Sequence, residues 1–164
     1  MQLPDAERLC AALADSLRPE LHPDTALVGI HTGGVWVAER LHAALGLKTP
    51  LGSLDVSFYR DDFSRSGLHP QLKSSDIPFA VEDRPIVIVD DVLYTGRTIR
   101  AAMNEIFDYG RPSRIDLAVL VDRGGRELPI WPRWCAHAMA LAPGQNLQLE
   151  RDIQGNLTLR LANA

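Results

Sequence analysis

Three short runs of apolar residues, each followed by a turn, constrain the fold of this chain more than any other feature. The runs span residues 26–30 (ALVGI), 86–89 (IVIV) and 115–121 (IDLAVLV). Helical patterns of apolar residues follow the first two runs, at residues 35–45 and from about Thr98. Fully apolar strands that alternate with helices are typical of a parallel sheet covered on both faces. We therefore predict an α/β fold with a central, mainly parallel sheet flanked by helices.

The chain as a whole, residues 1–164, fits a single domain, because this length and an apolar content of 46% allow one sizeable core. Residues 5–17 predict a further amphipathic helix, and residues 51–59 alternate as a half-exposed strand does. Residues 60–78 carry charge, Ser, Gly and Pro without periodicity. A loop of this length inside a compact domain is typical of a functional lid.

The charge and the cysteine content narrow the class of protein. A net charge of −4 argues against bulk affinity for nucleic acid or for an anionic membrane. No apolar run approaches the ~20 residues of a membrane span, and the first residues lack the pattern of a signal peptide. Cys10 and Cys135 are far apart and have no zinc-ligand spacing. We therefore expect reduced thiols in a cytoplasmic protein without a membrane partner.

The segment DDVLYTGRT, residues 90–98, combines several features of an anion site. A turn that enters a helix presents unpaired backbone N–H groups and the positive end of the helix dipole. Gly96 lets the backbone approach a ligand closely, and Thr95 and Thr98 offer hydroxyl groups. Taken alone, the turn also fits an ordinary strand–turn–helix connection in which Thr98 caps the helix.

The adjacent carboxylates of Asp90 and Asp91 favour a ligand that carries more than a phosphate. Two carboxylates at the end of a buried strand are costly, and both would repel a phosphate. Ionised carboxylates accept hydrogen bonds from ribose hydroxyls, and they bind Mg²⁺. A Walker-type triphosphatase site is excluded because no GxxxxGK[ST] loop precedes the pair. A receiver-type acidic pocket does not fit either, because a phosphate-binding turn would not directly follow its acidic pair.

An apolar strand followed by Asp-Asp and Thr-Gly-x-Thr resembles the phosphoribosyl pyrophosphate (PRPP) signature of type I phosphoribosyltransferases. Further segments are similar to the PyrR family of pyrimidine operon regulators, which are also uracil phosphoribosyltransferases. These segments are YRDD at 59–62, GRPSRI at 110–115 and LAVLVDRGGRELPI at 117–130. The similarity covers roughly residues 25–130. It implies the type I phosphoribosyltransferase fold, with a small β-rich hood over about residues 122–164.

The resemblance implies roles in PRPP binding and catalysis. Asp90 and Asp91 would contact the ribose hydroxyls, and Asp91 would also contact Mg²⁺. The 5′-phosphate would be held by Thr95, Gly96, Arg97 and Thr98, and the pyrophosphate by Thr32, Gly33 and Gly34. The lid would begin with Tyr59, Arg60 and Asp61. Arg60 would reach the pyrophosphate and complete a catalytic set with Asp90 and Asp91.

The resemblance also implies a base-reading segment within the hood, formed by Asp122, Arg123 and Gly124, in which Asp122 would complete the metal site. Arg123 and Arg126 flank a Gly-Gly turn and point to an anion or an RNA phosphate. Two positions depart from the family pattern. Gly33 stands in place of the arginine of Thr-Arg-Gly, which removes a cation from the pyrophosphate loop, and Gly125 stands in place of a frequent histidine.

Two functions follow from this resemblance. One is an enzyme that converts uracil and PRPP to UMP and pyrophosphate, and the other is a UMP- or UTP-sensing regulator that binds pyrimidine-operon leader RNA. The alternatives are an RNA-binding attenuator with little or no enzyme activity, and a purine phosphoribosyltransferase on the same scaffold. The acidic net charge and Gly125 weaken the RNA-binding interpretation. The resemblance also implies a homodimer or a larger homo-oligomer.

Overall fold

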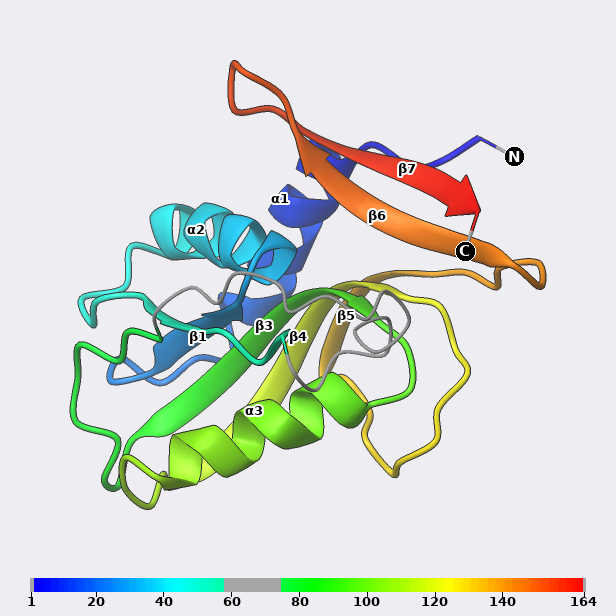
Figure 1. Cartoon of the computed structure of the whole chain (residues 1–164). Helices are drawn as coiled ribbons and strands as arrows, with labels where there is room; N and C mark the ends of the chain where they lie inside the picture. The colour runs from blue at the N-terminus through cyan, green and yellow to red at the C-terminus, as the bar shows by residue number, and fades with distance from the viewer. Residues whose placement is uncertain (1, 58–74, 164) are drawn as a thin grey trace.

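The computed structural model of the chain describes residues 2–57 and 75–163 (Figure 1). Within these residues, five strands form one sheet in the order β2–β1–β3–β4–β5, and all neighbouring strands are parallel. The strands are β1 (Ala26–Ile30), β2 (Gly52–Leu54), β3 (Pro85–Leu93), β4 (Arg114–Asp122) and β5 (Trp134–Ala138). The predicted α/β fold with a central parallel sheet is confirmed.

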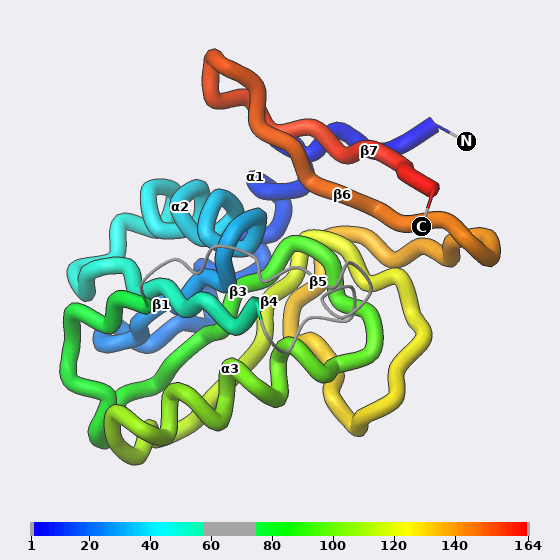
Figure 2. Tube along the Cα trace, in the orientation of Figure 1, coloured from blue at the N-terminus to red at the C-terminus, as the bar shows by residue number. Residues whose placement is uncertain are grey.

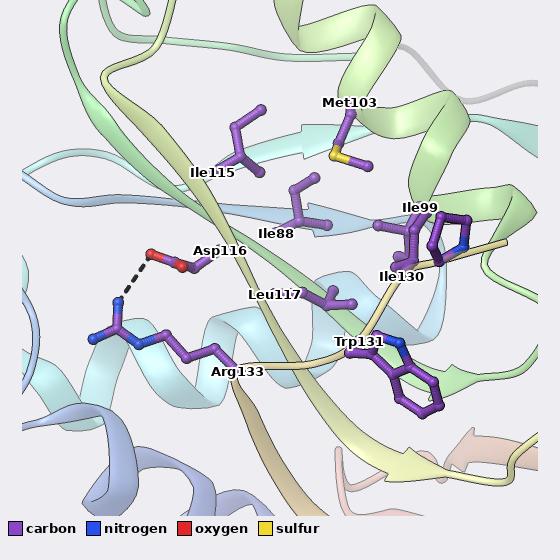
Figure 3. Close-up of a pocket in the computed structure, with 10 residues that line it drawn as sticks. Ile88, Ile99, Met103, Ile115, Asp116, Leu117, Ile130, Trp131 and Arg133 are labelled. Atoms are coloured by element: carbon purple, nitrogen blue, oxygen red, sulfur yellow. Dashed lines mark hydrogen bonds and ion pairs between the residues drawn. The ribbon is translucent and has the colours of Figure 1, made fainter. Parts of the chain in front are cut away.

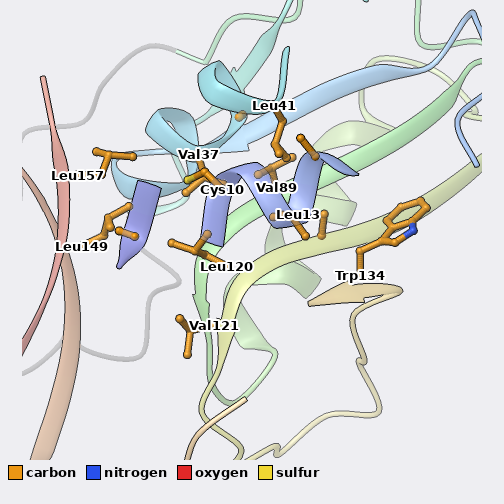
Figure 4. Packing of buried hydrophobic residues seen from close by; sticks show 14 of the residues in the cluster. Cys10, Leu13, Val37, Leu41, Val89, Leu120, Val121, Trp134, Leu149 and Leu157 are labelled. Carbon is orange, nitrogen blue, oxygen red and sulfur yellow. The ribbon is translucent and has the colours of Figure 1, made fainter. Parts of the chain in front are cut away.

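Helices cover both faces of this sheet (Figures 1 and 2). They are α1 (Ala6–Leu17), α2 (Gly33–Leu45) and α3 (Arg97–Phe107). Val87 and Val89 of β3 belong to the core shared with α1 and α2, whereas Ile86 and Ile88 belong to the core shared with α3. Figure 4 shows Val89 in the first of these cores, beside α1 and α2. Because alternate residues of a strand point to opposite faces, burial on both faces explains the uninterrupted run IVIV.

Strands β6 (Gln145–Arg151) and β7 (Leu157–Asn163) form a separate antiparallel hairpin that lies beside α1 (Figure 1). Glu7 of α1 fixes this hairpin, because its Oε2 accepts the N–H of Leu157 at 2.8 Å. The same carboxylate forms an ion pair with Arg40 of α2 at 3.0 Å, and this contact holds the pKa of Glu7 below its ordinary value. β5 lies in the predicted hood region, 122–164, but it pairs with β4 and joins the central sheet.

The predicted strand at residues 51–59 is much shorter in the structure, where β2 ends at Leu54. The cause is local, since the Asp55 carboxylate accepts the N–H of Ser57 at 3.0 Å and turns the backbone out of the strand. Phe58 and Tyr59 lie outside the described residues, as does most of the predicted lid at 60–78. In the described part of the lid, Asp76 pairs with Ser53 through two backbone hydrogen bonds of 2.8 Å.

In residues 2–57 and 75–163, no helix is both long and apolar enough to cross a membrane.

Candidate active site

The paired aspartates lie inside β3, where, among residues 2–57 and 75–163, only β4 pairs with the strand. β1 pairs with β3 as far as Val89, whereas β4 continues to pair with it through Asp90 and on to Leu93. The prediction that the pair follows the end of the strand was therefore wrong, because the equally long β4 carries the ladder four residues further. On the β1 side, the aspartates lie beyond the last strand pair and face the turn that begins α2.

That turn, Gly33-Gly34, packs directly on the aspartates. A methyl group at Gly33 would overlap Oδ2 of Asp91, and one at Gly34 would lie 2.6 Å from the carbonyl oxygen of Val89. Neither glycine has a positive φ, so space and not backbone conformation requires a glycine at both positions. The structure thus brings together the predicted pyrophosphate turn and the predicted ribose carboxylates.

Both aspartates are buried, and their carboxylates are held by the backbone of β3. Asp90 is 3% exposed and Asp91 is 9% exposed. Oδ1 of Asp90 accepts the N–H of Asp91 at 2.9 Å, and Oδ1 of Asp91 accepts the N–H of Val92 at 2.8 Å. These contacts fix the orientation of both side chains before any ligand binds.

The N-cap residues of the two helices that begin at this site do not cap them with a side chain. The α1 helix, which is remote from the site, is capped by Asp5, whose Oδ1 accepts the N–H of Arg8 at 3.0 Å. In contrast, the N-cap residues of α2 and α3 are Thr32 and Gly96, and neither makes a side-chain capping hydrogen bond. Uncapped N–H groups and the helix dipole favour anions. The two helix N-termini that flank the buried aspartates are therefore suited to anions.

The turn that leads into α3, together with the first two residues of that helix (residues 94–98), is called the phosphate turn. Gly96 has a φ of +94°, a left-handed conformation that favours glycine. The hydroxyl of Thr95 accepts the N–H of Arg97 at 3.2 Å and Thr95 is itself buried, while the Arg97 side chain is exposed and forms an ion pair with Glu127 at 2.8 Å. The predicted phosphate-binding residues thus lie on one turn, with Arg97 directed to a neighbouring loop.

That neighbouring loop, residues 122–131, is here called the hood loop, and it packs along the phosphate turn. The N–H groups of Glu127 and Leu128 both donate to the carbonyl of Thr95, at 2.9 and 3.2 Å. Gly125 has a φ of +86°, and a methyl group there would lie 2.5 Å from Cε1 of Tyr94. Because the Tyr94 ring fills this space, packing alone favours a glycine at position 125, independently of any ligand.

Asp122 uses both carboxylate oxygens within its own loop. Oδ1 accepts a hydrogen bond from the N–H of Gly124 at 3.0 Å, and Oδ2 accepts one from Nη2 of Arg126 at 2.7 Å. Burial opposes ionisation of Asp122, but these two hydrogen bonds outweigh it and hold its pKa below the ordinary value. The carboxylate therefore orders the hood loop.

The two hood-loop arginines also contact the protein itself. The guanidinium of Arg123 lies 3.9 Å from the centre of the Tyr94 ring and donates to Oδ1 of Asn146 at 3.2 Å. The Arg126 side chain is only 8% exposed. Sequence reasoning missed the place of Tyr94 between the two loops. The ion pair between Asp122 and Arg126 could have been predicted from the sequence, because these opposite charges lie four residues apart.

The end of the hood loop covers α3 loosely. Figure 3 shows Ile130 beside Ile99 of the first turn of α3, with Trp131 next to it. A cavity of 210 Å³ lies between this segment, α3 and the sheet, and Trp131 is 70% exposed. The packing of apolar side chains therefore holds this end of the loop less firmly than it holds a core segment.

The predicted lid residues Tyr59, Arg60 and Asp61 lie outside the described residues. The other predicted site residues fall into two groups. The first group lies on two turns and the strand between them, and consists of Asp90, Asp91, Thr32, Gly33, Gly34, Thr95, Gly96, Arg97 and Thr98. Asp122, Arg123 and Gly124 lie on the adjoining hood loop.

Comparisons with known proteins agree with this geometry. The phosphoribosyl transferase domain family matches residues 2–135. The chain is 59% identical to the bifunctional protein PyrR of Nitrosococcus oceani over 126 residues, which span 76% of this chain and 71% of that protein. It is 50% identical to the bifunctional protein PyrR of Pseudomonas savastanoi pv. phaseolicola over 153 residues, 91% of this chain and 90% of that protein. The chain belongs to the PyrR family of phosphoribosyltransferases.

Solved structures support the fold assignment of this PyrR family member. A hypoxanthine phosphoribosyltransferase from Staphylococcus aureus superposes with a TM-score of 0.64 at 20% identity, covering 84% of this chain and 75% of that one. A purine phosphoribosyltransferase from Pyrococcus horikoshii Ot3 gives a TM-score of 0.59 at 29% identity, covering 81% of this chain and 82% of that one. The predicted family and the predicted type I phosphoribosyltransferase fold are both confirmed.

Proposed function

We propose that the chain transfers phosphoribose from PRPP to uracil, forming UMP and pyrophosphate, and that the same site senses UMP or UTP in the regulation of pyrimidine genes. One observation carries this proposal. The N-termini of α2 and α3, neither of which is capped by the side chain of its N-cap residue, flank two buried carboxylates. One ligand with two anionic ends and a hydroxyl-rich centre is therefore complementary to the site. PRPP has this chemistry.

The proposed reaction displaces pyrophosphate from the anomeric carbon of ribose by a pyrimidine nitrogen. Positive charge develops on the ribose ring, and negative charge develops on the leaving group. The protein has to align the two reactants and stabilise both charges. A covalent nucleophile is not required for this displacement.

Each part of the site has a defined task in this proposal. The carboxylates of Asp90 and Asp91 accept hydrogen bonds from the ribose hydroxyls and lie close to the developing positive charge. The α3 N-terminus and the phosphate turn bind the 5′-phosphate, which fixes one end of PRPP. Backbone N–H groups at Gly33 and Gly34 bind the pyrophosphate, and they replace the side-chain cation that this loop lacks.

Magnesium fits the donors of this site. In the part of the chain that the structure describes, no three His, Cys, Asp or Glu side chains gather into a metal cage. Mg²⁺ is commonly held by one or two carboxylates together with substrate phosphates, so Asp91 with Asp90 beside it would hold a metal that arrives with PRPP. When bound, Mg²⁺ supplies positive charge that stabilises pyrophosphate as a leaving group.

A transfer assay with radiolabelled uracil, PRPP and Mg²⁺ tests the enzymatic half of the proposal. Labelled UMP is the expected product, and its formation should require both PRPP and the metal. If PRPP binds but no UMP forms, the chain is a nucleotide-sensing regulator without transferase activity. Transfer to hypoxanthine or guanine in place of uracil would instead support the purine alternative.

Thermal unfolding should distinguish pyrimidine from purine nucleotides. We expect UMP to raise the melting temperature more than AMP does at equal concentration, because the two share a ribose phosphate and differ only in the base. A ligand at a hundredfold excess over its Kd stabilises a protein by about 2.7 kcal/mol, which is readily measured. Equal shifts with UMP and AMP would contradict uracil selectivity of the hood loop.

Binding of leader RNA is the second proposed function, because the PyrR relatives at 50–59% identity are named bifunctional. We expect this binding to be weak in moderate salt, since the chain carries a net charge of −4 and Arg126 is buried in an ion pair. A gel shift of pyrimidine-operon leader RNA across a salt series measures it. A complex that survives moderate salt and strengthens with UMP would contradict this expectation. A homo-oligomer, which the family implies, would pool arginines from several copies.

A further inference from the structure

We propose that Arg126 is a positioning residue that couples the hood loop to the phosphate turn, and that it thereby places the hood loop to contact the base. The inference rests on the proposed function, because it assigns the base to the hood loop. It differs from the sequence-based interpretation of Arg126 as a contact for a ligand anion or for RNA.

The contacts of Arg126 join three separate points. Nη2 donates to Oδ2 of Asp122 at 2.7 Å, at the start of the hood loop. Nη1 donates to the carbonyl of Tyr94 at 2.9 Å, on the backbone of the phosphate turn. The guanidinium also lies 4.5 Å from the centre of the Trp131 ring, at the far end of the hood loop. A planar guanidinium can donate hydrogen bonds in two fixed directions at once, which a lysine ammonium does less well.

The polar contacts of Arg126 go to the protein itself in this arrangement. The side chain is 8% exposed, and Nε is buried without a hydrogen-bond partner among the described residues. A buried guanidinium with one unpaired donor is costly, so its two remaining polar contacts must offset that cost. Because its two hydrogen bonds are made within the protein, we infer that Arg126 acts through the groups that it holds.

The pattern of hydrogen bonds shows what Arg126 holds. Three consecutive residues of the hood loop, 126–128, donate to the consecutive carbonyls of Tyr94 and Thr95. The two backbone donors, at Glu127 and Leu128, converge on Thr95 alone. The hydrogen bonds of Arg126 therefore extend the contact to the Tyr94 carbonyl and, through Asp122, to the beginning of the loop, in addition to the contact of Arg123 with the Tyr94 ring.

Apolar packing supports the end of the loop only in part, because Ile130 packs against the core that includes α3 whereas Trp131 is 70% exposed. The cavity of 210 Å³ beneath Ile130 and the exposure of Trp131 leave this end loosely packed (Figure 3). Polar contacts thus contribute to the position of the loop. Removal of the Arg126 contacts should loosen the hood loop while the phosphate turn keeps its own helix N-terminus.

The test compares the affinities of two ligands by calorimetry, UMP and ribose 5-phosphate, in Arg126→Met and Arg126→Lys. UMP requires both loops, whereas ribose 5-phosphate requires the phosphate turn alone. In both variants we expect a loss of about tenfold or more in affinity for UMP and a change of less than about twofold for ribose 5-phosphate, because roughly one charge-assisted hydrogen bond is lost from the hood loop. The KM for uracil should rise more than the KM for PRPP.

Two variants keep this test interpretable. Arg126→Lys retains a positive charge beside Asp122, so it should fold even if Arg126→Met does not. Arg114→Met is the matched control, because Arg114 forms an ion pair with Asp116 at 2.8 Å at the opposite end of β4. This control should leave both affinities unchanged.

The outcomes separate this inference from the proposed function. Equal losses for UMP and ribose 5-phosphate, or no loss for either in a folded Arg126→Lys variant, would overturn the coupling role. A selective loss of UMP affinity supports the coupling role even if the unmodified chain transfers no uracil. In that case only the enzymatic half of the proposed function fails.

Discussion

Asp91→Asn is expected to reduce uracil transfer by at least about 100-fold, which corresponds to roughly 3 kcal/mol of transition-state stabilisation. The substitution removes the negative charge that lies closest to the glycine turn and that is proposed to contact both ribose and metal. An amide is a weaker acceptor than a carboxylate, and it is a poor ligand for Mg²⁺. Steady-state transfer of radiolabelled uracil measures the loss.

The fold should survive this substitution, because asparagine has nearly the same shape. Its side-chain oxygen can keep the hydrogen bond from the N–H of Val92, which is 2.8 Å long in the structure. Asp116→Asn is a matched control, since Asp116 is a partly buried carboxylate on the neighbouring strand that pairs with Arg114 and Arg133 away from the aspartate pair. Wild-type turnover in Asp91→Asn, with the melting temperature unchanged, would contradict the role assigned to Asp91.

Gly34→Ala should damage both stability and transfer. The new methyl group would lie 2.6 Å from the carbonyl oxygen of Val89 and 3.1 Å from Cα of Asp90, and these backbone atoms of a central strand cannot move aside. The start of α2 must therefore shift away from β3. Overpacking of this kind costs about 1–3 kcal/mol, and the shift should separate the pyrophosphate turn from the aspartates. We expect transfer to fall by about tenfold or more, since small misplacements in a site have large kinetic effects.

The other end of the same helix provides the control for this prediction. Gly46 ends α2 with a φ of +62°, and nothing lies within 4 Å of a methyl group placed there. Gly46→Ala should cost roughly 1 kcal/mol through backbone strain alone and leave transfer unchanged. Denaturant unfolding and the transfer assay, applied to both variants, separate loss of stability from loss of site geometry. Equal effects on transfer in the two variants would mean that Gly34 has no special place in the site.

Local patterns were sufficient to predict the parallel sheet and the site turns. The run IVIV before the aspartates predicted a strand buried on both faces, and the phosphate turn lies where its sequence placed it. Strand ends were less predictable, because they depend on the partner strand. β3 extends to Leu93 only because β4 is long enough to pair with it, and periodicity in one segment does not report the length of its neighbour.

Contacts between loops were the least predictable part of the site. The packing of Tyr94 against Gly125 joins residues that are far apart in sequence, and neither residue has a pattern that points to the other. Arg126 was interpreted from its charge as a group available to ligands. Its burial depends on how the hood loop folds back on the phosphate turn, which is a property of the tertiary structure.

The position of Asp90 and Asp91 within a paired strand has a consequence for the entropy of binding. Asp90 is in register with Val119 of β4, and the flanking residues Val89 and Val92 are paired as well. The backbone of this strand is therefore ordered before PRPP arrives, unlike that of a loop that folds around its ligand. Little conformational freedom remains to be lost when the sugar binds, so more of its interaction energy is available as affinity and as alignment of the reacting atoms.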